Sequence, residues 1–130
     1  TASLAAAEKA FSRAREIKPD DGVVWIGFGK LHWTRGRYLQ RVGGAWDREL
    51  DQALAALDTA QRFIPSSGQT RQDRAAILLD RARASSGAAR ERAARAALAA
   101  ADDAQAHNPN IAKELGVLRT EANQLLGEHR

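Results

Sequence analysis

The side chains that most often carry out chemistry are few in this 130-residue chain and lie far apart in the sequence. Its histidines are His32, His107 and His129, and none has a carboxylate at the spacing of a metal-binding or catalytic motif. The chain has no cysteine, which excludes disulfides, thiolate zinc sites and cysteine nucleophiles. No glycine-rich phosphate-binding motif occurs. The sequence therefore predicts a protein that is not an enzyme and that uses no cofactor and no metal.

Composition indicates what kind of scaffold holds these residues. Alanine and arginine dominate, aromatic residues make up 5% and there are only three prolines, so residues that favour helices prevail. The length suits one all-helical domain. No apolar run reaches the ~20 residues of a membrane span, and we expect a cytoplasmic protein. A net charge of +4 is compatible with nucleic-acid or acidic partners, but it does not select either.

A four-residue pattern occurs three times and gives the chain its organisation. The three sets are Ala7, Phe11, Ala14 and Pro19; Ala53, Leu57, Ala60 and Pro65; and Ala97, Ala101, Ala104 and Pro109. In each set the first three residues share one stripe of a helix, where small alanines allow a second helix to approach closely. The proline then ends the helix. Such a pattern is typical of a helical repeat array.

The repeats predict helices over 2–17, 22–41, 46–63, 69–84, 88–107 and 111–127, with turns at 43–44 and 85–87. Taken alone, residues 23–29 also suit a buried strand, because they are β-branched, aromatic and flanked by glycine. The repeat favours a helix there, on which Trp25, Phe28 and His32 form one stripe. Gly29 then marks the place where a neighbouring helix crosses, and Ala75 is its equivalent one repeat later.

These residues resemble the tetratricopeptide repeat family. Trp25, Phe28 and Gly29 match the pattern of the family's first helix, and the alanine, large residue, alanine and proline sets match its second helix. The resemblance implies an all-α, right-handed α-solenoid of antiparallel helical hairpins with about six helices, in one domain over 1–130. Its parts would be a truncated repeat (1–19), two full repeats (20–65 and 66–109) and a capping helix (110–130).

Two departures from the family are visible. The repeats are longer by ten to twelve residues than the usual length, so both helices of a hairpin must extend by about a turn and a half. In the third unit, Arg71 and Arg74 replace large apolar residues. The lengthened segments are similar to repeat regions attached to large bacterial serine/threonine protein kinases. This similarity implies a module of a larger polypeptide, in bacterial signalling.

The resemblance also implies a function, which is a non-catalytic scaffold that binds a peptide or protein in a concave groove lined by the first helices. Transferred position by position, the groove residues are Lys30, Trp33, Thr34, Arg37, Gln72, Ala76, Leu79, Arg83, Asn123 and Gln124. Trp33 is either an exposed anchor for a peptide or a packing residue buried against Leu39 or Leu50.

Two alternatives stay open. The arginine-rich third unit could bind nucleic acid or an acidic partner, although Asp73, Asp80 and Glu91 lie among its arginines and favour an ion-paired surface. Tyr38 and Trp46 are expected to pack within the lengthened hairpin. The chain could also be a structural spacer that associates with a second copy through its terminal helices.

Overall fold

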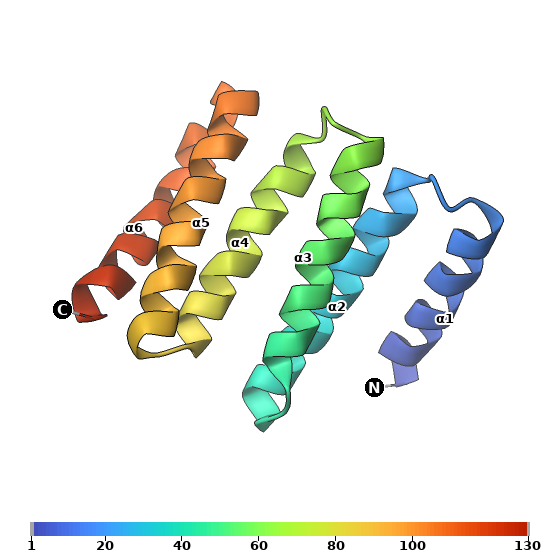
Figure 1. Ribbon diagram of the computed structural model, residues 1–130, viewed down its shortest axis with the longest axis horizontal. Coiled ribbons are helices and arrows are strands. Elements are labelled where there is room, and N and C mark those ends of the chain that lie inside the picture. Colours follow the sequence, from blue (N-terminus) through green and yellow to red (C-terminus); the bar gives the residue numbers. More distant parts are fainter. Residues whose placement is uncertain (1, 130) are drawn as a thin grey trace. The chain divides into compact units, whose positions relative to one another are not determined.

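The computed structural model describes residues 2–129, and these residues form six α-helices, one short 3-10 helix and no strand (Figure 1). The elements are α1 (Ala2–Ile17), α2 (Gly22–Val42), α3 (Trp46–Phe63), α4 (Gly68–Ala84), α5 (Gly87–His107), η1 (Pro109–Ile111) and α6 (Ala112–His129). The all-α prediction is confirmed, and the helix ends lie within two residues of those expected. Residues 23–29 are helical in α2, so the strand interpretation is wrong.

The helix ends follow from local chemistry. The Asp21 side chain accepts a hydrogen bond from the Val23 backbone N–H at the start of α2, and Ser67 does the same for Thr70 at the start of α4. Gly43 ends α2 with φ 80°, a left-handed conformation that favours glycine. The three repeat prolines each lie two residues beyond a helix end. The predicted caps and stops are therefore present.

Contacts divide the chain into two compact units, which are Thr1–Ser66 with α1 to α3 and Ser67–Arg130 with α4 to α6. In unit 1, three glycines of α2 stand seven residues apart, and each faces a large side chain from α3 or its C-cap. The pairs are Gly22 with Ile64, Gly29 with Leu57, and Gly36 with Leu50. A Cβ atom on any of these glycines would lie under 3.0 Å from its partner side chain. The two helices therefore pack closely along the whole lengthened hairpin, and the helix crossing expected at Gly29 is confirmed.

Helix α1 also packs on α2, but here a side chain of α1 fills the space left by a glycine of α2. A Cβ atom on Gly27 would lie 2.2 Å from a ring carbon of Phe11, so this glycine makes the space that the Phe11 ring occupies. Phe11, Leu4 and Ala7 pack against the buried cluster formed by Phe28, Leu31 and Ala56. Backbone contacts join α1 to α2 and α2 to α3, but none joins α1 to α3 within the described residues. Consequently α2 is the central helix of unit 1.

Unit 2 packs through small residues. The buried residues of α5 are all alanine: Ala93, Ala94, Ala97, Ala100, Ala101 and Ala104. The three α2 glycines correspond, one repeat later, to Gly68, Ala75 and Ala82 of α4, of which the two alanines are fully buried. Contacts join α6 to both α5 and α4. In the hairpin of α4 and α5, alanine therefore occupies the buried positions that glycine and leucine occupy in the hairpin of α2 and α3.

Arg71 shows how unit 2 accommodates an arginine where the repeat expects a large apolar residue. Its side chain is buried, with 6% exposed. The Arg71 Nε lies 3.4 Å from a carboxylate oxygen of Asp103 on α5, and Nη1 donates to the Ser67 carbonyl at 3.3 Å. Since a buried cation requires a partner, the Asp103 carboxylate is what makes this substitution acceptable.

Candidate functional site

Four of the expected binding residues lie together on one face of α2, and we call Lys30, Trp33, Thr34 and Arg37 the α2 face. Their spacing places them on the side of the helix away from Phe28, which packs in the core of unit 1. Lys30, Thr34 and Arg37 are exposed. The Arg37 guanidinium lies over the Trp33 ring, 4.5 Å from its centroid. The α2 face thus combines an aromatic ring with two cations.

Trp33 matches neither of the two expected alternatives. Its side chain is half-buried, so it is neither an exposed anchor nor a core residue. Stacking by arginine holds a tryptophan ring in place and desolvates one of its faces. A half-buried indole that is held in this way has lost part of its rotamer freedom before any ligand arrives, which reduces the cost of binding.

The expected residues on α4 behave differently from those on α2. Gln72 and Ala76 are half-buried, whereas Leu79 is buried with only 5% exposed. Leu79 therefore packs in the interior and presents almost no surface to a ligand, contrary to the expected groove contact. The reason is that α4 is buried on nearly all sides, so an apolar residue at this position serves the core.

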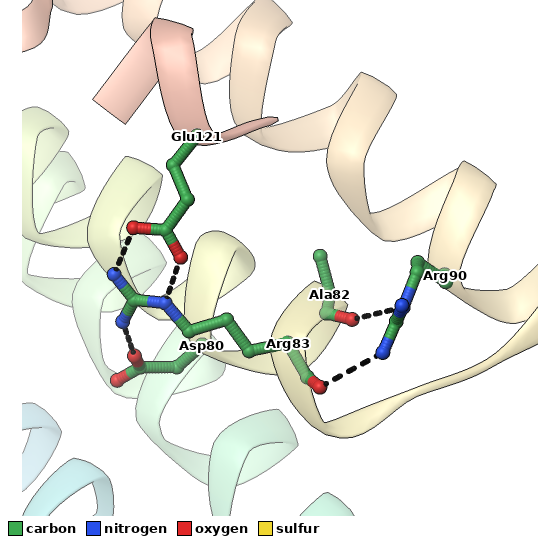
Figure 2. Close-up of polar contacts among 5 residues, drawn as sticks. All are labelled: Asp80, Ala82, Arg83, Arg90 and Glu121. Atoms are coloured by element: carbon green, nitrogen blue, oxygen red, sulfur yellow. Dashed lines mark hydrogen bonds and ion pairs between the residues drawn. The ribbon is translucent and has the colours of Figure 1, made fainter. Parts of the chain in front are cut away.

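Arg83, the fourth of these residues, holds two helices together. Its Nε and Nη2 donate to the two carboxylate oxygens of Glu121 on α6, with Nη2 to Oε1 at 2.6 Å, while Nη1 donates to Asp80 at 2.6 Å (Figure 2). The hydrogen bond from Arg83 lowers the pKa of Glu121, although partial burial opposes this. The bond to Glu121 likewise raises the pKa of Arg83. A ligand that used Arg83 would have to displace this bidentate pair.

This ion pair predicts a pH dependence of stability. Because the pKa of Glu121 is lower in the folded state than in the unfolded state, its contribution is present above the unfolded pKa and is lost as pH falls through the folded one. We expect Glu121→Gln to cost up to about 1 kcal/mol at pH 7, since the pair is partly exposed, and to cost less at about pH 3, which lies below the unfolded pKa. Urea unfolding followed by circular dichroism at both pH values measures this. A cycle with Arg83→Gln isolates the pair, and a coupling energy equal at both pH values would contradict the prediction.

On α6, the remaining expected residues are exposed. Asn123 and Gln124 both face solvent. Gln124 also lines a shallow hollow of about 770 Å³ along α6, next to Val117, whose side chain is 75% exposed. These positions are accessible, and Lys113 lines the same hollow, but none of its lining residues is aromatic. The α2 face is therefore the better-formed of the expected binding surfaces.

Most arginines of unit 2 are engaged in contacts within the protein. The Arg90 guanidinium, on α5, donates to the carbonyl groups of Ala82, Arg83 and Ser85 at the end of α4, two of which appear in Figure 2. It thereby supplies donors to a helix C-terminus, where a cation is stabilising. Arg95 pairs with Glu91 on the same helix. A phosphate backbone would have to compete with these partners.

The histidines also have structural partners. His32 Nδ1 hydrogen-bonds a carboxylate oxygen of Glu49 at 2.7 Å, which links α2 to α3. His107 Nδ1 hydrogen-bonds the backbone oxygen of Asp103 at 2.9 Å. The side chain of His129 lies outside the described residues. Within the residues that the structure describes, no group of three histidine or carboxylate side chains could hold a metal ion.

Sequence reasoning missed one feature, which is a cleft between α1 and α3. It has a volume of about 340 Å³ and is lined by residues of all three helices of unit 1, with Trp25 and Phe28 among them. The stripe containing these aromatic residues was visible in the sequence, but it was interpreted as packing alone. Arg15 lies over both rings. It directly follows the second alanine of the repeat pattern, and this position beside the packing stripe was the feature of the sequence that could have indicated the cleft.

None of the described helices combines the length and the apolar character that crossing a membrane requires. Comparison with known protein families, curated proteins and solved structures found no match to this chain.

Proposed function

We propose that this chain is a non-catalytic protein-interaction module that resembles tetratricopeptide repeats and binds a peptide or protein segment on the α2 face. The observation that carries the proposal is the stack of Arg37 on the half-buried Trp33 ring, with exposed Lys30 and Thr34 beside it. Tryptophan and arginine are the residues that most often dominate binding energy at protein interfaces.

The position of this face in unit 1 supports the proposal. Since α2 packs through its glycines on α3 and through Gly27 on α1, its remaining side is the one that carries Lys30, Trp33 and Arg37. A rigid helix that is packed on two sides positions side chains more accurately than a loop does. The cations and the ring suit a segment that offers carboxylates together with an apolar side chain.

The wider context follows from the resemblance and is part of the proposal. The three alanine and proline sets match the family's second helix, and the lengthened repeats are similar to those attached to large bacterial serine/threonine protein kinases. The module would then act in bacterial signalling, in the cytoplasm, as part of a larger polypeptide. Its role would be to bring a partner to that polypeptide.

The test is capture of a partner from lysate of the source organism, followed by affinity measurement with the purified partner. The bait proteins are the natural chain and a variant with Lys30→Ala, Trp33→Ala and Arg37→Ala, each with and without nuclease. A double variant with Lys9→Ala and Arg13→Ala, which removes the same two charges from an exposed side of α1, is the matched control.

We expect a protein partner whose affinity falls at least about tenfold for the triple variant and is unchanged for the control, with or without nuclease. Capture that disappears with nuclease would contradict the proposal and favour nucleic-acid binding. No capture by the natural chain would favour a structural spacer instead.

A further inference from the structure

The cleft between α1 and α3, which we call the aromatic cleft, lies on the side of α2 away from Trp33. Its floor is formed by Trp25 and Phe28, whose ring centroids are 5.8 Å apart. It exists because α1 and α3 both pack on α2 but share no backbone contact with each other. Its volume of about 340 Å³ is at the lower end of the range for ligand pockets, about 300 to 1,000 Å³.

The floor of the cleft is held in place before any ligand binds. Trp25 Nε1 donates a hydrogen bond to the Pro19 carbonyl at 2.9 Å, which fixes the orientation of the indole. Phe28 is buried and contacts Phe11 of α1, with ring centroids 5.6 Å apart. The aromatic surface therefore requires little reorganisation to accept a ligand.

A cation that is not neutralised by any carboxylate lies over this floor. The Arg15 guanidinium is 5.7 Å from the Trp25 centroid and 5.2 Å from the Phe28 centroid. Among the described residues, Arg15 makes ring contacts but no ion pair. Such stacking orients a guanidinium and leaves its N–H groups at the edge available to an anion.

A second cation lies at the same end of the cleft. Arg62 of α3 donates to the hydroxyl of Thr59, which lines the cleft, at 3.1 Å and makes no ion pair with the residues described. Arg15 lies in the last turn of α1 and Arg62 in the last turn of α3. The ends of both helices lie beside the start of α2 (Figure 1). The Arg62 guanidinium therefore lies beside a residue of the cleft lining, although Arg62 itself does not line the cleft.

The other polar groups near the cleft have hydrogen-bond partners. Glu8 accepts a hydrogen bond from Arg35 at 2.5 Å, and His32 pairs with Glu49. The α3 residues that line the cleft are uncharged. Arg15 is therefore the one charged lining residue without an ion-pair partner among the described residues, and Arg62 adds a second unpaired cation beside Thr59.

We propose that the aromatic cleft binds a glutamate or aspartate side chain of an acidic peptide, with its carboxylate on Arg15 and Arg62. Arginine suits this role because its planar fork donates two parallel hydrogen bonds to a carboxylate. The apolar stem of the acidic side chain would lie on the Trp25 and Phe28 rings. This site goes beyond the proposed function, since it uses a different face of α2 and different residues.

The test measures the binding of fluorescein-labelled peptides to the full chain by fluorescence anisotropy. One peptide is blocked at both ends and alternates glutamate with alanine over nine residues, and a second replaces each glutamate with glutamine. The protein variants are Arg15→Gln and Arg62→Gln. Arg13→Gln is the matched control, because it removes the same charge from α1 outside the cleft.

We expect the glutamate peptide to bind at least about tenfold more tightly than the glutamine peptide, with the preference lost in Arg15→Gln and reduced in Arg62→Gln. Arg13→Gln and the triple variant of the α2 face should bind the peptide as the natural chain does. The experiment can therefore contradict this site without contradicting the proposed function, and the reverse also holds. Arg62→Gln covers the case in which Arg15→Gln loosens α1, since Arg62 lies on α3, which shares no backbone contact with that helix.

Three outcomes would overturn the proposal. Equal affinity for both peptides would exclude carboxylate recognition. Equal loss in Arg13→Gln would show attraction by overall charge alone. Preferential, Arg15-dependent binding of a single-stranded oligonucleotide of equal charge would assign the cleft to phosphate instead of to an acidic peptide.

Discussion

Gly27→Ala is expected to destabilise unit 1 by about 2 to 3 kcal/mol, as other overpacking changes do. The added Cβ would lie 2.2 Å from Phe11 Cε1 and 2.5 Å from Cζ, which is inside the space of the ring. The ring is stiff, so Phe11 must leave its contact with Phe28 or α1 must shift as a whole. Because α2 is the only described helix with which α1 makes backbone contacts, the substitution should detach α1.

The measurement is urea unfolding followed by tryptophan fluorescence. All three tryptophans, Trp25, Trp33 and Trp46, lie in unit 1, so this signal reports on that unit alone. Gly116→Ala on α6 is the control, because no atom lies within 4 Å of its added Cβ. Its unfolding is followed by circular dichroism, since α6 belongs to unit 2. That change should stabilise by about 0.5 to 1 kcal/mol through helix propensity. The same effect for both substitutions would show that Phe11 does not pack on Gly27.

Ala53→Leu is expected to cost about 3 kcal/mol, at the upper end of the cost of overpacking a core. Ala53 has no exposed surface, and its carbonyl oxygen lies 3.5 Å from where a Gly29 Cβ would be. The α2 and α3 backbones are thus nearly in contact at this level, and three additional carbon atoms have no space. Ala60→Leu, also fully buried, should behave in the same way.

The same fluorescence-detected unfolding measures these changes. Ala55→Leu is the matched control, since Ala55 is on the same helix but exposed, and its cost should stay within about 0.5 kcal/mol. If Ala53→Leu and Ala60→Leu unfold at the same urea concentration as the natural chain, α2 does not pack on α3 through these positions.

The local structure was predictable from the sequence, because the relevant signals lie within a few residues of one another. Proline, cap residues and glycine recur at fixed offsets and mark the helix ends. Gly29 was identified as a crossing point from its place in the repeat. Gly22 and Gly36 lie at a seven-residue spacing on either side of it, but they were not identified from the sequence. Their pairing with Ile64 and Leu50 becomes evident only when α3 is in place.

The candidate site was less predictable, because its properties depend on residues that are distant in the sequence. Arg83 was expected to face a ligand, but its guanidinium donates hydrogen bonds to the carboxylate of Glu121, which lies 38 residues away in the sequence. No spacing rule identifies such a pair. Leu79 has the helical position of a surface residue, and only the packing around α4 buries it. Arg15 lies over two rings of another helix, which the pattern of its own helix does not reveal.

The contrast between α2 and α5 has a consequence for the order of folding. Four of the 21 residues of α2 are glycine, and each costs a free helix about 1 kcal/mol relative to alanine. An isolated α2 is therefore a poor helix, and it forms when α3 supplies the side chains that fill its glycine surface. In α5 alanine occupies the buried positions, so that helix can begin to form before its partners dock. During synthesis, α2 therefore becomes a stable helix only after α3 has been made. In the hairpin of α4 and α5, by contrast, α5 is partly helical before it docks.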